Sequence, residues 1–134
     1  MNKIIFHHPK INNDKQTSFF VPVSADNQST ITDQIAEVLV EQHYKKGRIK
    51  KGMTVIDCGA NIGLASIYFN NWAKIIYALE PNPRNYECLV ANTQKYNKIK
   101  PFCVGLAART TTEFMKNNGD YPVAESLFGT GEIK

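Results

Sequence analysis

The sequence lacks the features that would place it in a membrane, in a secreted scaffold or among disordered proteins. None of its apolar runs approaches the roughly 20 residues that a membrane-spanning helix requires. The apolar stretch after Met1 is also too short for a secretory signal peptide. Hydrophobic residues make up 43% of the chain and charged residues 21%, as in folded globular proteins. We therefore expect a cytoplasmic globular protein with no membrane partner, and its 134 residues suit one domain.

Cysteine is scarce as well. Cys58, Cys88 and Cys103 are odd in number, and neither they nor the three histidines show the spacing of metal ligands. A disulfide framework is therefore excluded as the basis of the fold. We expect reduced, buried thiols and no bound metal. Because no histidine lies near Cys58 in sequence, we interpret it as a small residue in a tight position and not as a nucleophile.

Acidic residues are outnumbered by basic ones, which gives a net charge of +4. The excess is concentrated in Lys45–Lys51, where five of seven residues are basic. Nucleic-acid-binding surfaces contain such clusters, but no aromatic interleaving or RNA-binding motif accompanies this one. We interpret it as a solvated connector before the first core strand, and nucleic acid as a disfavoured partner.

The first 52 residues read as an N-terminal extension. Ile4–Phe6 and Ser18–Val23 are predicted to pair as a hairpin across a polar stretch, with Pro22 placing the second segment at a sheet edge. A helix is predicted from Thr30 to about Tyr44. Its start resembles a capping box, and it carries an apolar stripe at helical spacing: Ile31, Ile35, Val38 and Leu39.

Residues 53–134 read as a partial Rossmann-like domain in which strands and helices alternate. The pattern predicts strands at 53–56, 73–79 and 99–104, with helices at about 62–70 and 82–96. The first strand is apolar and β-branched, which is typical of a strand buried on both faces. A further strand is suggested at 110–115, while the tail at 129–134 has no clear periodicity.

The order of these elements predicts an α/β fold with a parallel sheet. Right-handed crossovers give the strand order 3-2-1, in which the third strand lies outermost. Pro101 in that strand agrees with this order, because proline cannot donate to a ladder and belongs at a sheet edge. Only half of a doubly wound sheet is visible in the pattern.

The turn after the first strand carries a ligand-binding pattern. Asp57 ends the strand, and Gly59 and Gly63 follow it, with the helix predicted to begin near Ile62. Glycines let the backbone approach a ligand closely, and free amides at a helix start suit a carboxylate. Asp57 is placed to accept from an amino group. A ligand end that carries both a carboxylate and an amino group would thus find a complementary partner for each charge.

A second acid follows the second strand. Glu80 is suited to accept from both hydroxyls of a ribose, and Pro81 and Asn82 lie in the loop where an adenine would lie. A dinucleotide site would instead have Gly-x-Gly-x-x-Gly and no acid at the strand end. Here Ala60, Asn61 and Ile62 interrupt that pattern. The residues therefore favour S-adenosylmethionine (SAM) over NAD, and methyl transfer as the activity.

At these residues the sequence resembles class I SAM-dependent methyltransferases, and within them the FkbM-type family. Val55–Gly63 is similar to that family's glycine loop. Ala78–Pro83, followed by Leu89 and Asn92, is similar to its second-strand acid and the helix after it. The resemblance covers roughly residues 44–108.

The resemblance implies a Rossmann-like SAM-binding fold and O-methylation of a sugar or another small-molecule hydroxyl. By position it implies cofactor contacts for Asp57, Gly59, Asn61, Gly63 and Glu80. In that family a later acidic strand helps to form the acceptor pocket, but nothing after Thr111 matches it. The resemblance therefore assigns no catalytic base.

We hypothesise that the chain is the cofactor-binding part of an FkbM-type methyltransferase, inactive or weak alone. It would be truncated, or completed by self-association or another chain at an open sheet edge. Two alternatives stay open. One is a non-catalytic SAM- or nucleoside-binding module. The other is an RNA methyltransferase, which the basic cluster suggests but the lack of an Asn/Asp-Pro-Pro-aromatic motif disfavours.

Overall fold

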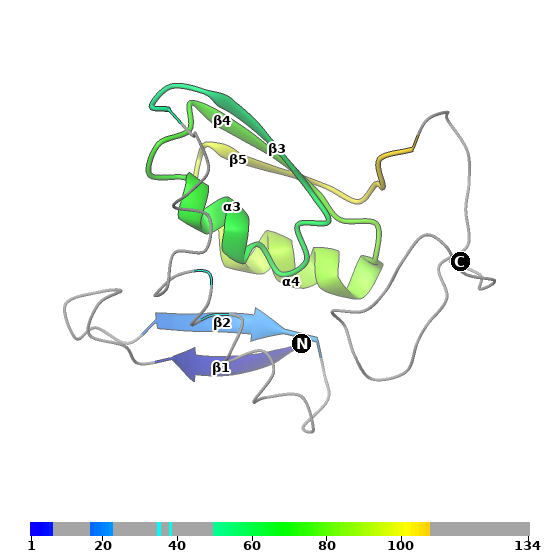
Figure 1. Cartoon of the computed structure of the whole chain (residues 1–134). Coiled ribbons are helices and arrows are strands. Elements are labelled where there is room, and N and C mark those ends of the chain that lie inside the picture. Colours follow the sequence, from blue (N-terminus) through cyan, green and yellow to red (C-terminus); the bar gives the residue numbers. More distant parts are fainter. Residues whose placement is uncertain (7–16, 23–34, 36–37, 39–49, 108–134) are drawn as a thin grey trace.

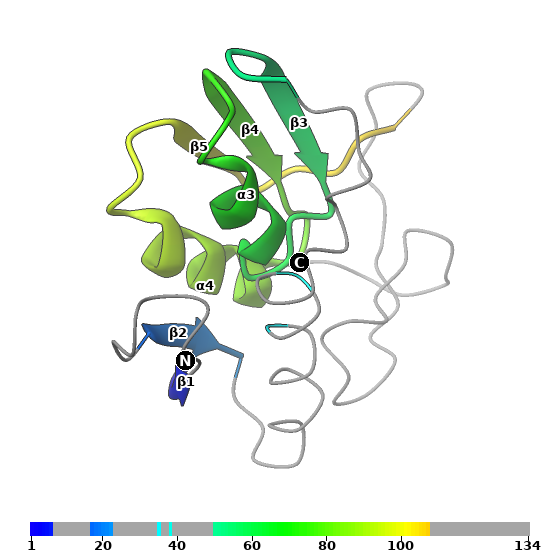
Figure 2. The same cartoon turned by 60° about the vertical axis from the view of Figure 1, so that its left-hand side comes forward.

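The described residues form three layers: a two-stranded hairpin, a pair of helices and a three-stranded sheet (Figure 1). The computed structural model describes residues 1–6, 17–22, 35, 38 and 50–107. The elements in chain order are β1 (Asn2–Phe6), β2 (Thr17–Val21), β3 (Thr54–Cys58), α3 (Leu64–Phe69), β4 (Ile75–Leu79), α4 (Pro83–Thr93) and β5 (Ile99–Phe102). Figure 2 shows the same layering from another direction, with the helices between the hairpin and the sheet.

The sheet is parallel and has the order β3-β4-β5. This is the predicted 3-2-1 half of a Rossmann-like sheet, so the α/β prediction is confirmed. Pro101 lies opposite Ala78 in β5, which pairs only with β4 in the described sheet. Because all three strands run the same way, their carboxyl ends lie at one edge, and the loops that follow β3 and β4 meet there.

Local sequence explains where the helices begin. Asn82 caps α4 by accepting from the backbone amides of Arg84 (2.8 Å) and Asn85 (3.3 Å), and Pro83 occupies the first helical position as predicted. The helix ends at Thr93, before the predicted Tyr96. Tyr96 instead donates its amide to the carbonyl of Thr93 in a tight turn (2.8 Å).

The helix α3 begins at Leu64 and not near Ile62. Gly63 precedes it with a φ of 93°, and Asn61 has a φ of 51°. Left-handed backbone cannot continue into a right-handed helix, so the glycine loop extends up to Gly63. Trp72 lies near the following turn as expected, with its ring centroid 4.9 Å from that of Tyr68.

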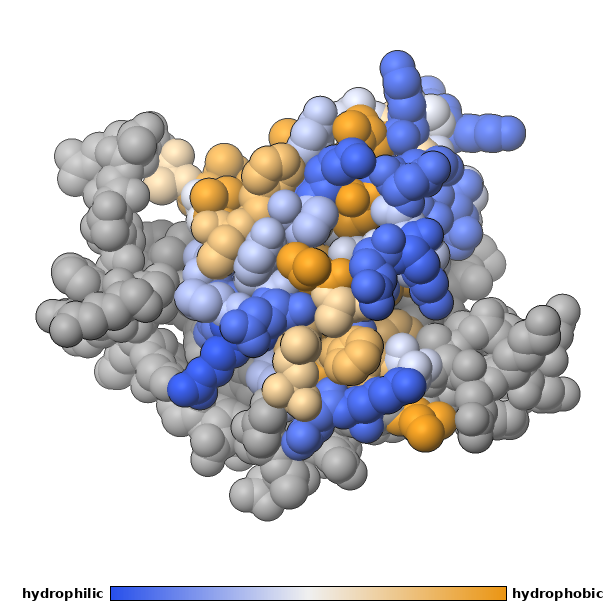
Figure 3. All heavy atoms as spheres, turned by 180° about the vertical axis from the view of Figure 1, so that it is seen from behind, coloured by the Kyte–Doolittle hydropathy of each residue, from blue (hydrophilic) through white to orange (hydrophobic). Residues whose placement is uncertain are grey.

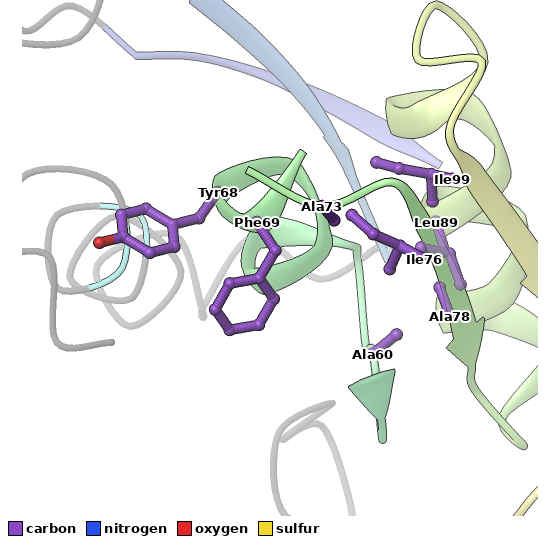
Figure 4. Packing of buried hydrophobic residues seen from close by; sticks show 8 residues of the cluster. All are labelled: Ala60, Tyr68, Phe69, Ala73, Ile76, Ala78, Leu89 and Ile99. Carbon is purple, nitrogen blue, oxygen red and sulfur yellow. The ribbon is translucent and has the colours of Figure 1, made fainter. Parts of the chain in front are cut away.

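The core lies between the sheet and the helices. Ile76, Ala78 and Ile99 point from β4 and β5 toward Leu89 of α4 (Figure 4). Ile76, Ala78 and Leu89 have no exposed surface, so this contact is tightly closed. Burying a side chain of the size of isoleucine or leucine contributes roughly 1.5–3 kcal/mol.

The prediction that the first strand is buried on both faces is wrong for the described structure. Ile56 of β3 is 62% exposed, and it shares a face with Tyr77 and Phe102. Both described helices cover the opposite face. Hydrophobic residues are also visible between hydrophilic ones when the molecule is viewed from behind (Figure 3). An apolar composition therefore identified the strand but not which of its faces is covered.

The hairpin is confirmed, with β1 antiparallel to β2, and it packs on the other side of α4. Phe19 and Val21 of β2 join a buried cluster with Ile62 and Leu64. Four segments lie outside the described residues: the polar stretch at 12–16, most of the helix predicted at 30–44, the strand suggested at 110–115 and the tail at 129–134. Within the predicted helix, Ile35 is fully buried in the same cluster.

The prediction of buried thiols is correct only for Cys88. All three cysteines are free, but Cys58 and Cys103 are exposed. Cys58 shares the uncovered face of the sheet with Ile56, which is why it does not fill a tight position. Burial raises the pKa of Cys88 from 9.0 to about 11, so this thiol stays protonated at neutral pH. Among the described residues, no helix is both long and apolar enough to cross a membrane.

We predict that Gly63→Ala destabilises the protein by about 2–4 kcal/mol, because strain and a clash add. A Cβ on Gly63 would lie 2.8 Å from Cδ1 of Leu89 and 3.0 Å from Cγ2 of Thr93. Gly52→Ala is the matched control, since Gly52 has a similar φ of 88° but no atom within 4 Å of such a Cβ. It should cost only about 1–2 kcal/mol in urea unfolding. Equal losses for both variants would contradict the packing argument.

Candidate functional site

The glycine loop folds over the end of the neighbouring strand. The amides of Gly59 and Ala60 both donate to the carbonyl of Leu79, each at 2.9 Å. The amide of Gly63 then donates to the carbonyl of Ala60 (2.8 Å) and closes the turn before α3. These bonds fix the loop at the carboxyl edge of the sheet, where open α/β sheets bind their ligands.

Glu80 ties this loop to the next one. Its Oε2 accepts from the amide of Asn61 (2.7 Å), and its Oε1 accepts from the amide of Asn82 (2.9 Å). The residue is only 5% exposed. Burial raises the pKa of Glu80, the two amides and the side chain of Asn85 oppose that rise, and the charge of Asp57 adds to it. The two sequence-predicted acids therefore lie close enough to interact.

Asp57 is bound to the first helix. The Ser66 hydroxyl on α3 donates to its Oδ2 at 2.6 Å, and Ser66 is fully buried. Desolvation raises the pKa of Asp57, and the hydrogen bonds from Ser66 partly lower it. The residue is half-buried, so part of its surface is exposed at this edge of the sheet.

The middle of the loop is open on one side. Gly59 has a φ of 77°, and a Cβ built on it would meet no atom within 4 Å. Asn61 holds a left-handed conformation that asparagine tolerates, and its buried Oδ1 has no hydrogen-bond partner among the described residues. A conformational demand, free space and an unpaired acceptor thus occur together. This combination fits a ligand that passes beside the backbone and brings a donor.

The structure brings all the sequence-predicted site residues to this edge of the sheet: Asp57, Gly59, Ala60, Asn61, Gly63, Glu80, Pro81 and Asn82. Gly63 differs from Gly59, because the position of its missing side chain faces α4 and not open space. The space beside it is filled by α4, so its lack of a side chain serves helix packing and not ligand approach. Gly105–Ala107 follow β5 and are exposed.

Sequence reasoning missed three polar residues that organise the site. Ser66 holds Asp57, Asn85 bonds to Glu80, and Asn92 reaches the carbonyl of Ile62 (2.9 Å). Ser66 and Asn92 sit on helix faces that also carry apolar residues, and a polar residue on a buried face is the signal that identifies such a partner. No group of three His, Cys, Asp or Glu that could hold a metal occurs in the described part of the chain.

No protein-family model matches the sequence. A search of curated proteins also finds no match.

Several solved structures are similar to parts of the chain. TYW2 from M. jannaschii, in complex with AdoMet, is 19% identical, with 84% of this chain and 47% of that chain covered and a TM-score of 0.46. Trm5b from Pyrococcus abyssi is 26% identical, with coverages of 48% and 20% and a TM-score of 0.43. A putative RNA methyltransferase from Pyrococcus horikoshii is 26% identical, with coverages of 55% and 37% and a TM-score of 0.42. The chain thus spans less than half the length of these proteins. These TM-scores are too low to support an argument about the ligand, so the ligand class is inferred from the geometry of the site.

The raised pKa of Asp57 predicts a pH-dependent gain in stability for Asp57→Asn. Between the unfolded value, near 3.8, and the higher folded value, the folded state binds more protons, so the contribution of Asp57 to stability falls as pH rises. Asparagine keeps an acceptor for Ser66 but cannot ionise. The variant should therefore be more stable than the wild type at pH 7, with the gain vanishing toward pH 3, in urea unfolding.

Ser66→Ala provides the opposite control. It removes the hydrogen bond that favours the ionised form of Asp57, so it should lower stability at pH 7. An Asp57→Asn variant that is less stable than the wild type at neutral pH would contradict the assignment of desolvation as the main cause.

Proposed function

We propose that this site binds SAM and that the protein acts in SAM-dependent methyl transfer. The observation that carries the proposal is the placement of two carboxylates, Asp57 and Glu80, on either side of a left-handed loop with open space at Gly59. SAM carries an ammonium group and two ribose hydroxyls, and each kind of donor needs an acceptor. The site offers both acceptors at one sheet edge.

Each residue has a distinct proposed role. Asp57 accepts from the ammonium group, and the open space beside Gly59 lets the same end of the ligand pass close to the loop. Glu80 accepts from a ribose hydroxyl. Its two oxygens have about four lone-pair sites, and the amides of Asn61 and Asn82 with the side chain of Asn85 use three of them, which leaves one site for a ribose hydroxyl. Pro81 and Asn82, both half-buried, flank the adenine.

The same geometry argues against a dinucleotide. A pyrophosphate would lie over the loop, close to the half-buried carboxylate of Asp57, and the two like charges would repel each other. The loop also lacks a second glycine at position 61, where Asn61 stands. SAM has no phosphate, so it avoids this repulsion.

The proposed reaction is O-methylation of a sugar or small-molecule hydroxyl, as the FkbM-type resemblance implies, in the cytoplasm. An oxygen lone pair forms the new bond to the methyl carbon, the sulfur keeps the electrons of the breaking bond, and the hydroxyl proton is lost. Since the sulfonium is already a strong electrophile, alignment and deprotonation of the acceptor are the main demands on the protein.

The described sheet has an unpaired edge at β3 and an exposed face that a partner could cover. In the described structure β3 pairs only with β4, and the face that carries Ile56 and Tyr77 is exposed. We propose that a strand and helix of another chain, or of a second copy, cover them. If so, Ile56→Lys should abolish association in sedimentation velocity while it changes monomer stability by no more than about 0.5 kcal/mol.

RNA is a weaker candidate for the acceptor. Lys50 and Lys51 are exposed, but they precede the amino end of β3, whereas the site lies at its carboxyl end. Five strand residues separate the two ends by roughly 17 Å. If RNA is the acceptor, reversing the charges of Lys45, Arg48 and Lys50 should abolish RNA binding, and unchanged binding would exclude this role for the cluster. A non-catalytic SAM-binding module is the remaining alternative, with SAM binding but no transfer.

We predict that calorimetry detects binding of SAM and not of NAD, and that Glu80→Ala weakens SAM binding by about 1–3 kcal/mol through lost hydrogen bonds. Glu87→Ala is the matched control, because Glu87 is an exposed acid on α4. It should leave affinity unchanged. Circular dichroism must show that Glu80→Ala is folded, because its two amide partners lose their acceptor. No heat with SAM on folded wild-type protein would refute the proposal.

A further inference from the structure

Asn92 joins three segments that are far apart in sequence. It lies on α4 and is 7% exposed. Its Oδ1 accepts from the amide of Phe20 at 2.6 Å, and its Nδ2 donates to the carbonyl of Phe20 at 2.8 Å. The same Nδ2 donates to the carbonyl of Ile62 in the glycine loop at 2.9 Å. One side chain therefore bonds to the hairpin and the loop at once.

The chemistry of these bonds requires an asparagine. The side chain must accept from an amide and donate to two carbonyls, and only a carboxamide provides one acceptor and two donors on this short stem. Aspartate would place a charge against two carbonyl oxygens. Leucine would leave three backbone groups unpaired, the buried carbonyl of Ile62 and the part-buried amide and carbonyl of Phe20.

Apolar packing reinforces the same link. Phe19 and Val21 flank Phe20 in β2, and both are buried in one cluster with Ile62 and Leu64. Ile62 belongs to the glycine loop and Leu64 begins α3. The hairpin therefore packs against the glycine loop, and it does so through apolar side chains as well as through Asn92.

From these contacts we infer that the N-terminal hairpin is part of the ligand site, and that Asn92 is a positioning residue that sets the glycine loop through the Ile62 carbonyl. The inference rests on the proposed function only for the identity of the ligand. The loop holds Asn61, a non-glycine residue, at a φ of 51°, which is unfavourable in an isolated chain. Hairpin docking through Asn92 keeps this conformation populated before any ligand arrives.

Amide hydrogen exchange of the ligand-free protein tests the coupling. In Asn92→Leu, amides of both the hairpin and the loop, Gly63 included, should exchange about tenfold faster than in the wild type. Thr93→Val is the matched control: it removes another buried bond of α4, from Thr93 Oγ1 to the Leu89 carbonyl (2.7 Å), but keeps the shape of the side chain. It should leave hairpin and loop exchange unchanged.

A second pair of variants acts from the hairpin side, in case Asn92→Leu does not fold. Phe20→Pro removes the amide that donates to Asn92, whereas Phe20→Ala removes the side chain and keeps that amide. Loop exchange should be faster in the proline variant than in the alanine variant. Faster exchange in the hairpin with an unchanged loop would overturn the inference.

Ligand binding separates this inference from the proposed function. Asn92→Leu should weaken SAM about tenfold but should barely affect 5′-methylthioadenosine, which lacks the amino-acid end that the loop holds. Equal loss for both compounds, or none for SAM, would contradict a positioning role. If wild-type protein binds neither compound, the proposed function fails, while the exchange experiment still decides whether Asn92 sets the loop.

Discussion

The site depends on one interaction: the Glu80 carboxylate accepts hydrogen bonds from two backbone amides. Asn61 donates from the glycine loop and Asn82 from the loop after β4, so one side chain fixes the distance between the two loops. Bonds from amides to a carboxylate are stronger than neutral ones. Asn82 in turn caps α4, which couples this junction to the longest described helix.

The two acids of the site, Asp57 and Glu80, lower the stability of the folded protein at neutral pH. Desolvation raises the pKa of both Asp57 and Glu80, so their ionised forms are less favourable in the folded protein than in water. A protein selected for stability alone would have little reason to place two carboxylates at one sheet edge. Cationic or hydroxyl donors from a ligand would offset this cost, and for that reason the perturbed acids point to binding.

Residues with strict local demands made much of the fold predictable. Asn82 and Pro83 predicted the start of α4, and Pro101 predicted an edge strand. Helix capping and the missing amide of proline both follow from backbone chemistry. Contacts across long sequence separations were not predictable in the same way. Asn92 meets Phe20 from 72 residues away, and Gly63 faces α4, which no local pattern encodes. The exposure of Cys58 and Ile56 likewise depends on what covers a sheet face, not on the strand itself.

The glycine loop also explains why the three layers need one another. Asn61 in this loop has a φ of 51°, a conformation that a non-glycine residue keeps only when its surroundings over-determine it. Glu80 constrains the loop from the sheet side, and α4 constrains it through Asn92 and the close approach at Gly63. The hairpin then constrains α4 through Phe20. Removal of any one layer takes away one of these constraints, so the ligand-binding geometry is a property of the assembled layers and not of the motif alone.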